Sequence, residues 1–207
     1  MPPPTDPLVL VSGFGAFESV ELNPSGEIAK ALAHAPPRGL RVAAAVLPVS
    51  FERAPRAWDD VLAACGPPAF CLGLGVAKRP GFRLERWAKP VLKHVPRPDV
   101  DGRLPAEFSR AGARLEAGAD LPRLLAALVR RGVADVRISR TAGGYVCERV
   151  YHHLLQRAGE LGVPGLFVHV PPLRYTALER QEEVLRWLLD ELFPADGAPQ
   201  SSSSRRG

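Results

Sequence analysis

The sequence predicts an α/β fold, a three-layer sandwich in which a mainly parallel, twisted central sheet is flanked by helices. Short apolar runs rich in β-branched residues alternate along the chain with amphipathic helical patterns, the order that produces strand–helix–strand units. The 207 residues are 46% apolar and 24% charged, which is typical of a globular domain. We expect one domain over residues 1–193 and a disordered tail over 194–207, where apolar periodicity stops.

The first part of the chain alternates strand and helix. Residues 8–13 (LVLVSG) form a short apolar run closed by glycine, as in a buried strand. Asn23 can cap a helix over the following residues, and Pro24 suits its first position. The next elements predicted are a strand at 40–49, a helix at 53–65 and a strand at 69–75.

Residues 78–118 lack clean periodicity and are rich in proline, arginine and glycine. We expect an irregular segment there, with room for a small hairpin and a long excursion over one face. Regular structure resumes after it. A helix is predicted over 120–132, with Asp120 as its cap and Gly132 as its stop.

The last part of the chain again alternates the two element types. A strand at 135–139 precedes a helix that starts near Cys147, and a buried strand follows at 165–170. Thr176 and Glu179 have the spacing of a capping box, which predicts that the final helix begins there. In parallel sheets, function gathers in the loops after the carboxyl ends of strands. The loops at 13–23, 74–90 and 139–147 are therefore the candidates, together with the end of strand 165–170.

Composition and charge exclude several classes of protein. The net charge is +5, but no basic–aromatic interleaving or finger motif accompanies it, so we expect no nucleic-acid partner. No apolar run approaches the ~20 residues of a membrane span, and the first residues, MPPPTDP, do not resemble a signal peptide. The three cysteines include no C-x-x-C pair, and no zinc-ligand spacing occurs. We expect a cytoplasmic protein without a membrane partner, metal or other cofactor.

The loop GFGAFESVELNP after the first strand has two readings. A dinucleotide-binding loop needs a third glycine for helix–strand packing, and Glu18 stands in its place, so the cofactor reading is weak. Phe14 and Phe17 either pack into the core behind a glycine turn or line an apolar pocket at the functional edge of the sheet. The residues alone leave these two alternatives open.

Cys147 stands where a polar turn runs into a predicted helix. A free cysteine is most often a buried small hydrophobe. Gly143 and Gly144 precede it and are expected to let the backbone approach a ligand with free amide groups, which could stabilise an oxyanion. The positive end of the helix dipole also favours a negatively charged sulfur. Cys65 and Cys71 lack these features, so Cys147 is the candidate nucleophile, without excluding a structural thiol.

A cysteine nucleophile needs a base, and the base needs an orienting carboxylate. His169 lies near the carboxyl end of a buried strand, where an imidazole is costly unless it has a partner or a task. His152 and His153 fall on the predicted surface of the helix that Cys147 opens. Glu85 lies in a basic stretch after a sheet strand. Taken alone, it is better explained as one partner of a solvated salt bridge than as the orienting carboxylate.

The chain resembles the pyroglutamyl peptidases (pyrrolidone-carboxylate peptidases), a family of cysteine peptidases. The resemblance covers roughly residues 8–192 and keeps the family's order and spacing. The matching segments are LVLVSGFGAFESVELNPS at 8–25, VLPVSF at 46–51, LER at 84–86, SRTAGGYVC at 139–147 and FVHVPPL at 167–173.

The resemblance implies a catalytic triad of Glu85, Cys147 and His169, which needs no metal. It implies peptide substrates with an N-terminal pyroglutamate, and homotetramers like those of bacterial members. It also implies a pocket with two aromatic walls, three further apolar walls and backbone groups that bind the lactam. The aromatic walls are Phe14 and Phe17, and the further apolar walls are Val49, Tyr145 and Val146. The backbone groups belong to Gly75 and Val76.

The chain departs from the family pattern in four places. LGLGVAKRP at 72–80 replaces a glycine-rich stretch, and RWAKPVLKHVPRPDVDG at 86–102 lacks an arginine in the family's position, Arg97 being displaced. Ala16 and Arg140 replace a proline and an asparagine. Three hypotheses follow: a pyroglutamyl-peptide hydrolase, a divergent relative that cleaves another small N-blocked or cyclic amide, and an idle homologue that serves as a binding protein.

Overall fold

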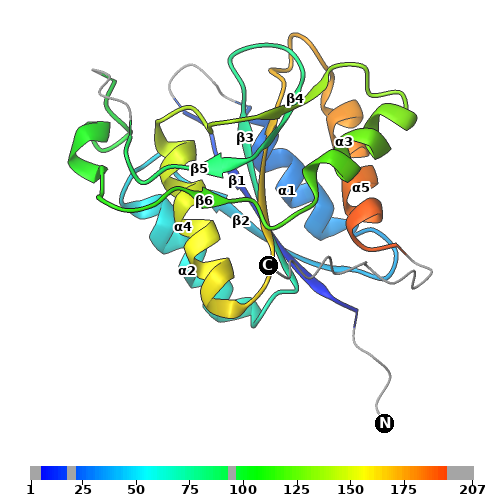
Figure 1. Ribbon diagram of the computed structural model, residues 1–207, viewed down its shortest axis with the longest axis horizontal. Helices are drawn as coiled ribbons and strands as arrows, with labels where there is room; N and C mark the ends of the chain where they lie inside the picture. Colours follow the sequence, from blue (N-terminus) through cyan, green and yellow to red (C-terminus); the bar gives the residue numbers. More distant parts are fainter. Residues whose placement is uncertain (1–5, 18–21, 93–96, 195–207) are drawn as a thin grey trace, which may run out of the picture.

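A computed structural model describes residues 6–17, 22–92 and 97–194. Six strands form the central sheet in the order β2-β1-β3-β8-β4-β7 (Figure 1). These strands are β1 (Leu8–Phe14), β2 (Arg41–Leu47), β3 (Phe70–Val76), β4 (Phe82–Glu85), β7 (Val136–Ser139) and β8 (Gly165–Val170). Strands β2, β1, β3 and β8 run parallel, whereas β4 is antiparallel to β8 and parallel to β7. The predicted mainly parallel sheet is confirmed.

Five helices cover the two faces of the sheet. They are α1 (Pro24–His34), α2 (Arg53–Cys65), α3 (Leu121–Arg130), α4 (Val146–Leu161) and α5 (Leu178–Leu192). Helices α1, α3 and α5 pack on one face and share a hydrophobic cluster with it, while α2 and α4 share a second cluster with the other face (Figure 1). The three predicted layers are therefore present, and each face of the sheet is sealed by its own apolar core.

The segment predicted to be irregular contains a strand of the central sheet, so that part of the prediction is wrong. In β4, Phe82 and Leu84 are buried in the cluster beneath α1, α3 and α5. Because side chains alternate along a strand, Arg83 and Glu85 belong to the opposite face, which α4 covers. The predicted hairpin corresponds to β5 (Trp87–Ala88), which pairs antiparallel with β6 (Leu115–Glu116); the short helix η1 (Pro105–Phe108) lies between them in the chain.

Two of the three predicted helix caps are present. The Asn23 side chain accepts a hydrogen bond from the Ser25 amide, and Asp120 accepts one from the Arg123 amide. The capping box at the last helix is wrong. Its N-cap is Ala177, without a side-chain cap, and the carbonyl of Thr176 instead accepts a hydrogen bond from the Gln181 amide group at 2.7 Å.

All but the first residue of the predicted tail at 194–207 lies outside the described residues. Among the residues that are described, every helix is too short or too polar to cross a bilayer.

Candidate active site

Cys147 lies in the first turn of α4, whose N-cap is Tyr145. The preceding Gly143 and Gly144 have φ of 101° and 78°, a backbone conformation that other residues rarely adopt. This turn brings the chain from β7 to the start of a 16-residue helix. The sulfur therefore sits at the helix end that favours negative charge.

Gly75 of β3 lies directly beneath this sulfur. A Cβ atom at Gly75 would stand 3.0 Å from Cys147 Sγ and 3.0 Å from the ring of Phe167. The absence of a side chain on β3 thus lets Cys147 approach the sheet beside β8. Gly75 is also the register partner of His169, which places that histidine on the strand next to the sulfur.

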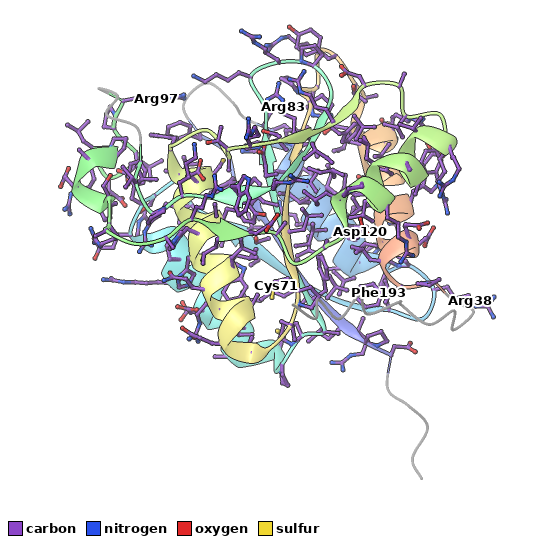
Figure 2. All side chains as sticks on the ribbon, in the orientation of Figure 1. Arg38, Cys71, Arg83, Arg97, Asp120 and Phe193 are labelled. Carbon is purple, nitrogen blue, oxygen red and sulfur yellow. The ribbon has the colours of Figure 1, made fainter. Side chains whose placement is uncertain are left out.

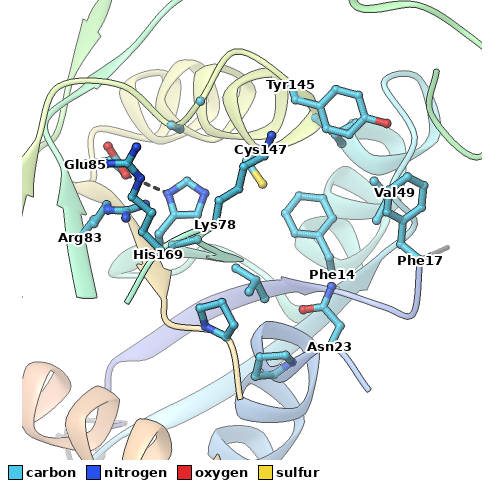
Figure 3. Close-up of a pocket in the computed structure, with 18 of the residues that line it drawn as sticks. Phe14, Phe17, Asn23, Val49, Lys78, Arg83, Glu85, Tyr145, Cys147 and His169 are labelled. Carbon is cyan, nitrogen blue, oxygen red and sulfur yellow. Dashed lines mark hydrogen bonds and ion pairs between the residues drawn. The ribbon is translucent and has the colours of Figure 1, made fainter. Parts of the chain in front are cut away.

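His169 and Glu85 meet across the antiparallel pair β8 and β4. Nδ1 of His169 lies 2.8 Å from Oε1 of Glu85, and both side chains are almost completely buried (Figure 3). The Glu85 backbone is held as well, because its carbonyl accepts a 2.7 Å hydrogen bond from the Tyr151 hydroxyl of α4. Glu85 ends a central strand and is fully buried, so the prediction of a solvated salt bridge at this residue is wrong.

The surroundings of His169 favour its charged form. Burial, the largest effect, opposes a charged imidazole, but hydrogen bonds to Cys147 and Glu85 and the negative charges of both outweigh it. Together they raise the pKa of His169 from 6.5 to about 9. Cys147, His169 and Glu85 therefore form a chain in which an imidazolium is stabilised on both sides.

The remaining described cysteines, Cys65 and Cys71, do not line the cavity that contains Cys147. Burial raises the pKa of Cys71 to about 12 and also raises the pKa of Cys65. Both thiols therefore stay protonated near neutral pH, as expected for structural cysteines.

The two histidines of α4 lie apart from the site. His152 is buried, contrary to the surface position we predicted, and burial lowers its pKa. His153 packs against Trp58, and its Nε2 lies 3.1 Å from Asp59. Neither lines the cavity that contains Cys147.

Beside Cys147 opens a cavity of about 1190 Å³. Its apolar lining includes all five predicted walls together with Val76: Phe14, Phe17, Val49, Val76, Tyr145 and Val146. Figure 3 shows Phe14, Phe17 and Val49 on one side of Cys147, with His169 and Glu85 on the other. Gly75 is absent from the lining, because it lies under the sulfur.

Arg97 also lines this cavity, although the sequence indicated only a displaced arginine. Its guanidinium lies 5.3 Å from the ring centre of Phe17 and 5.2 Å from that of Tyr145. The Tyr145 hydroxyl donates a 2.6 Å hydrogen bond to the carbonyl of Pro98. This contact ties the chain next to Arg97 to the start of α4.

Glu148 is a buried residue of the site that sequence reasoning missed. It directly follows Cys147, and its two carboxylate oxygens reach back to the preceding turn and to Lys89. Oε1 accepts a hydrogen bond from the Lys89 amide at 2.8 Å, and Oε2 accepts from the Thr141 hydroxyl at 2.7 Å and the Gly144 amide at 3.1 Å. Glu148 is the third residue of the helix, a position from which a glutamate often bonds back to the residues before the helix. This position is the one signal in the sequence that could have indicated its role.

The glycine amides are not free, so that expectation is wrong. The amide of Gly144 binds Glu148, and the amide of Gly143 donates to the Thr141 hydroxyl at 3.3 Å. Donors for an oxyanion must be sought in the first turn of α4, where Val146 and Cys147 have no preceding helical carbonyl to bind.

Comparison with known proteins extends this local picture to most of the chain. A family profile described as "Pyroglutamyl peptidase" matches residues 8–186. A protein named pyrrolidone-carboxylate peptidase from Gloeobacter violaceus is 35% identical over 170 residues, which cover 80% of this chain and 82% of that protein. One of the same name from Yersinia pestis is 30% identical over 181 residues, 83% of this chain and 81% of its own length.

Solved structures with the same fold include two peptidases. The pyrrolidone carboxyl peptidase from Fervidobacterium islandicum superposes with a TM-score of 0.80 at 27% identity, covering 89% of this chain and 97% of that one. The pyroglutamyl peptidase I from Bacillus amyloliquefaciens has a TM-score of 0.80 at 22% identity, covering 90% and 94%, and supports the fold alone.

Proposed function

The chain belongs to the pyroglutamyl peptidase family, and we propose that it is a cysteine exopeptidase that hydrolyses the amide bond after an N-terminal pyroglutamyl residue. The observation that carries the proposal is the 2.8 Å contact of His169 with Glu85, with Cys147 beside the same imidazole. A thiol, an imidazole and a buried carboxylate in this order are the groups that acyl transfer to sulfur requires.

In this mechanism the thiolate of Cys147 attacks the carbonyl carbon of the pyroglutamyl residue. His169 holds the proton taken from the thiol and donates it to the leaving amine, so that the amide bond breaks as an acyl-enzyme forms. Glu85 stays ionised, orients the imidazole through Nδ1 and stabilises its positive charge. Water activated by His169 then hydrolyses the thioester and restores the thiol.

The oxyanion of the tetrahedral intermediate needs donors close to the sulfur. The first-turn amides of Val146 and Cys147 are suitable because a helix supplies them with no acceptor. Glu148 acts as a positioning residue here, since it holds Gly144 and Thr141 and thereby fixes the turn from which the helix starts.

The apolar side of the cavity suits the ring of pyroglutamate, which is small, flat and uncharged. Phe14, Phe17 and Val49 offer apolar walls, and Tyr145 closes the cavity near the sulfur. An open-chain N-terminal glutamate would bring a charged ammonium group against these apolar walls and into a cavity that the cationic Arg97 also lines, at a cost in hydration and charge repulsion. The pocket therefore favours the cyclised lactam over the open-chain residue.

The proposal includes the setting in which the enzyme works. We expect a homo-oligomer, a tetramer as in bacterial members of the family, acting in the cytoplasm on small peptides. Its three cysteines are free thiols in the structure, as is usual in a reducing compartment. Light scattering of the purified protein measures the oligomeric state directly.

A fluorogenic pyroglutamyl amide tests the function. The wild-type protein releases the fluorophore, and Cys147→Ser lowers kcat/KM by at least about 10³-fold because a hydroxyl is a far weaker nucleophile than a thiolate. Cys65→Ser is the matched control and retains activity. A folded wild-type protein whose Cys147 reacts with iodoacetamide but which releases no fluorophore contradicts the proposal.

A further inference from the structure

The cavity beside Cys147 has a second side that neither the mechanism nor the lactam pocket uses. Five cationic side chains line it: Lys78, Arg79, Arg83, Arg137 and Arg174. They come from β4, β7, the connection between β3 and β4, and the segment after β8. Figure 3 shows Arg83 on the side of His169 and Glu85, away from Phe14 and Phe17.

Few negative charges balance this group. Glu85 is the one carboxylate among the described lining residues, and it is bound to His169. Asp135 lies close to Arg83 without lining the cavity. No carboxylate in the described part of the chain comes within ion-pair distance of any of the five cations.

Three of the five cations act on one another. Burial lowers the pKa of Arg83, and the positive charge of Arg137 lowers it further; Arg79 acts in the same direction, while Glu85 and Asp135 oppose them. The repulsion between like charges that line one cavity is reduced when an anion binds among them.

The position of this group relative to the reaction follows from the roles of Cys147 and His169. The scissile carbonyl must lie at the sulfur, and the leaving nitrogen must lie within hydrogen-bond reach of the imidazole. With the lactam ring held on the side of Phe14, the leaving peptide continues past His169 toward Arg83.

We propose that the cationic side of the cavity is a subsite for a carboxylate in the leaving part of the substrate, so that the enzyme prefers short acidic pyroglutamyl peptides. The inference rests on the proposed function. Two sources supply the same chemistry: the free C-terminal carboxylate of a pyroglutamyl dipeptide, and an acidic side chain directly after the pyroglutamyl residue.

Four matched substrates test the subsite and separate the two sources: pyroglutamyl-alanine, pyroglutamyl-alanine amide, pyroglutamyl-aspartic acid α-amide and pyroglutamyl-lysine amide. At an ionic strength of about 0.01 M, an anionic peptide recognised by the subsite has a kcat/KM roughly tenfold above that of the neutral alanine amide. The kcat/KM of the lysine peptide is lower than that of the neutral amide. At about 1 M salt the differences shrink to within roughly twofold.

Arg137→Gln and Arg174→Gln are the informative variants because both side chains are exposed and take no part in the chemical steps. Each lowers kcat/KM for the anionic peptide and leaves the neutral amide unchanged. Arg38→Gln is the matched control: it removes the same charge from an exposed site far from Arg83 (Figure 2) and alters neither substrate.

Each outcome of this experiment decides the proposal. Preference for pyroglutamyl-alanine alone assigns the subsite to a C-terminal carboxylate, and preference for the aspartyl peptide alone assigns it to an acidic side chain. Equal kcat/KM for all four substrates at low salt overturns the subsite while the proposed function stands. If none of the four substrates is cleaved, the subsite and the proposed function are both refuted.

Discussion

Nδ1 of His169 lies 2.8 Å from Oε1 of Glu85, although 84 residues separate them in the chain. The contact joins the end of β4 to β8, its antiparallel neighbour in the sheet, and both side chains are almost fully buried. A buried carboxylate and imidazole stabilise each other only as a charged pair or by a shared proton. This pair is thus a costly arrangement that the proposed reaction explains and the packing alone does not.

His169→Ala removes the proposed general acid–base group, so we expect kcat/KM to fall by about 10²–10⁴-fold. His153→Ala is the matched control, because this histidine packs against Trp58 outside the cavity; its kcat/KM stays within about threefold of the wild-type value. Steady-state kinetics on a pyroglutamyl amide measures both variants. Equal losses in the two variants refute the role of His169.

Glu85→Gln keeps the shape of the side chain but removes its charge, and we expect kcat/KM to fall by roughly 10²-fold or more. The pH profile adds an independent readout. The carboxylate helps to raise the pKa of His169 to about 9, so wild-type kcat/KM falls as the imidazolium loses its proton near pH 9. Without this charge the pKa of His169 drops, and the alkaline limb moves to lower pH. An unmoved limb contradicts the pairing.

Gly75→Ala tests the close approach of β3 to the sulfur of Cys147, the proposed nucleophile. The added Cβ meets both Cys147 Sγ and the Phe167 ring at 3.0 Å, so the sulfur must shift. We expect a clear loss of kcat with only a small loss of thermal stability. Gly159→Ala is the control in the last turn of α4, where a Cβ has open space; it raises the free energy of unfolding by at most about 1 kcal/mol. Unchanged kcat in Gly75→Ala argues against this placement of the sulfur.

Glu148→Gln tests the carboxylate that holds the turn before Cys147. An amide group accepts on only one side, so the donor of either Lys89 or Gly144 faces an NH2 group. We expect a loss of about 1–3 kcal/mol in the free energy of unfolding and a drop in kcat of about tenfold from the displaced turn. Glu179→Gln, an exposed change on α5, is the control. Lower stability with intact kcat shows a structural role alone.

The sequence by itself determined much of the local structure. Apolar periodicity located the helices and most strands, and the short-range chemistry of Asn23 and Asp120 predicted two caps because a cap joins residues within one turn. The same local reasoning placed Cys147 at the start of a helix. These features depend on neighbours in the chain, so the chain order suffices to predict them.

The tertiary structure decided which residues meet. Strand β4 escaped prediction because arginine and glutamate alternate with only two apolar residues, Phe82 and Leu84, in four positions. Its antiparallel register then placed Glu85 beside His169, which no local pattern encodes. Glu148 accepts a hydrogen bond from the Lys89 amide, 59 residues away in the chain, and the cations of β4 and β7 gather because their strands are neighbours. Such contacts come from sheet order and register, which long-range packing sets.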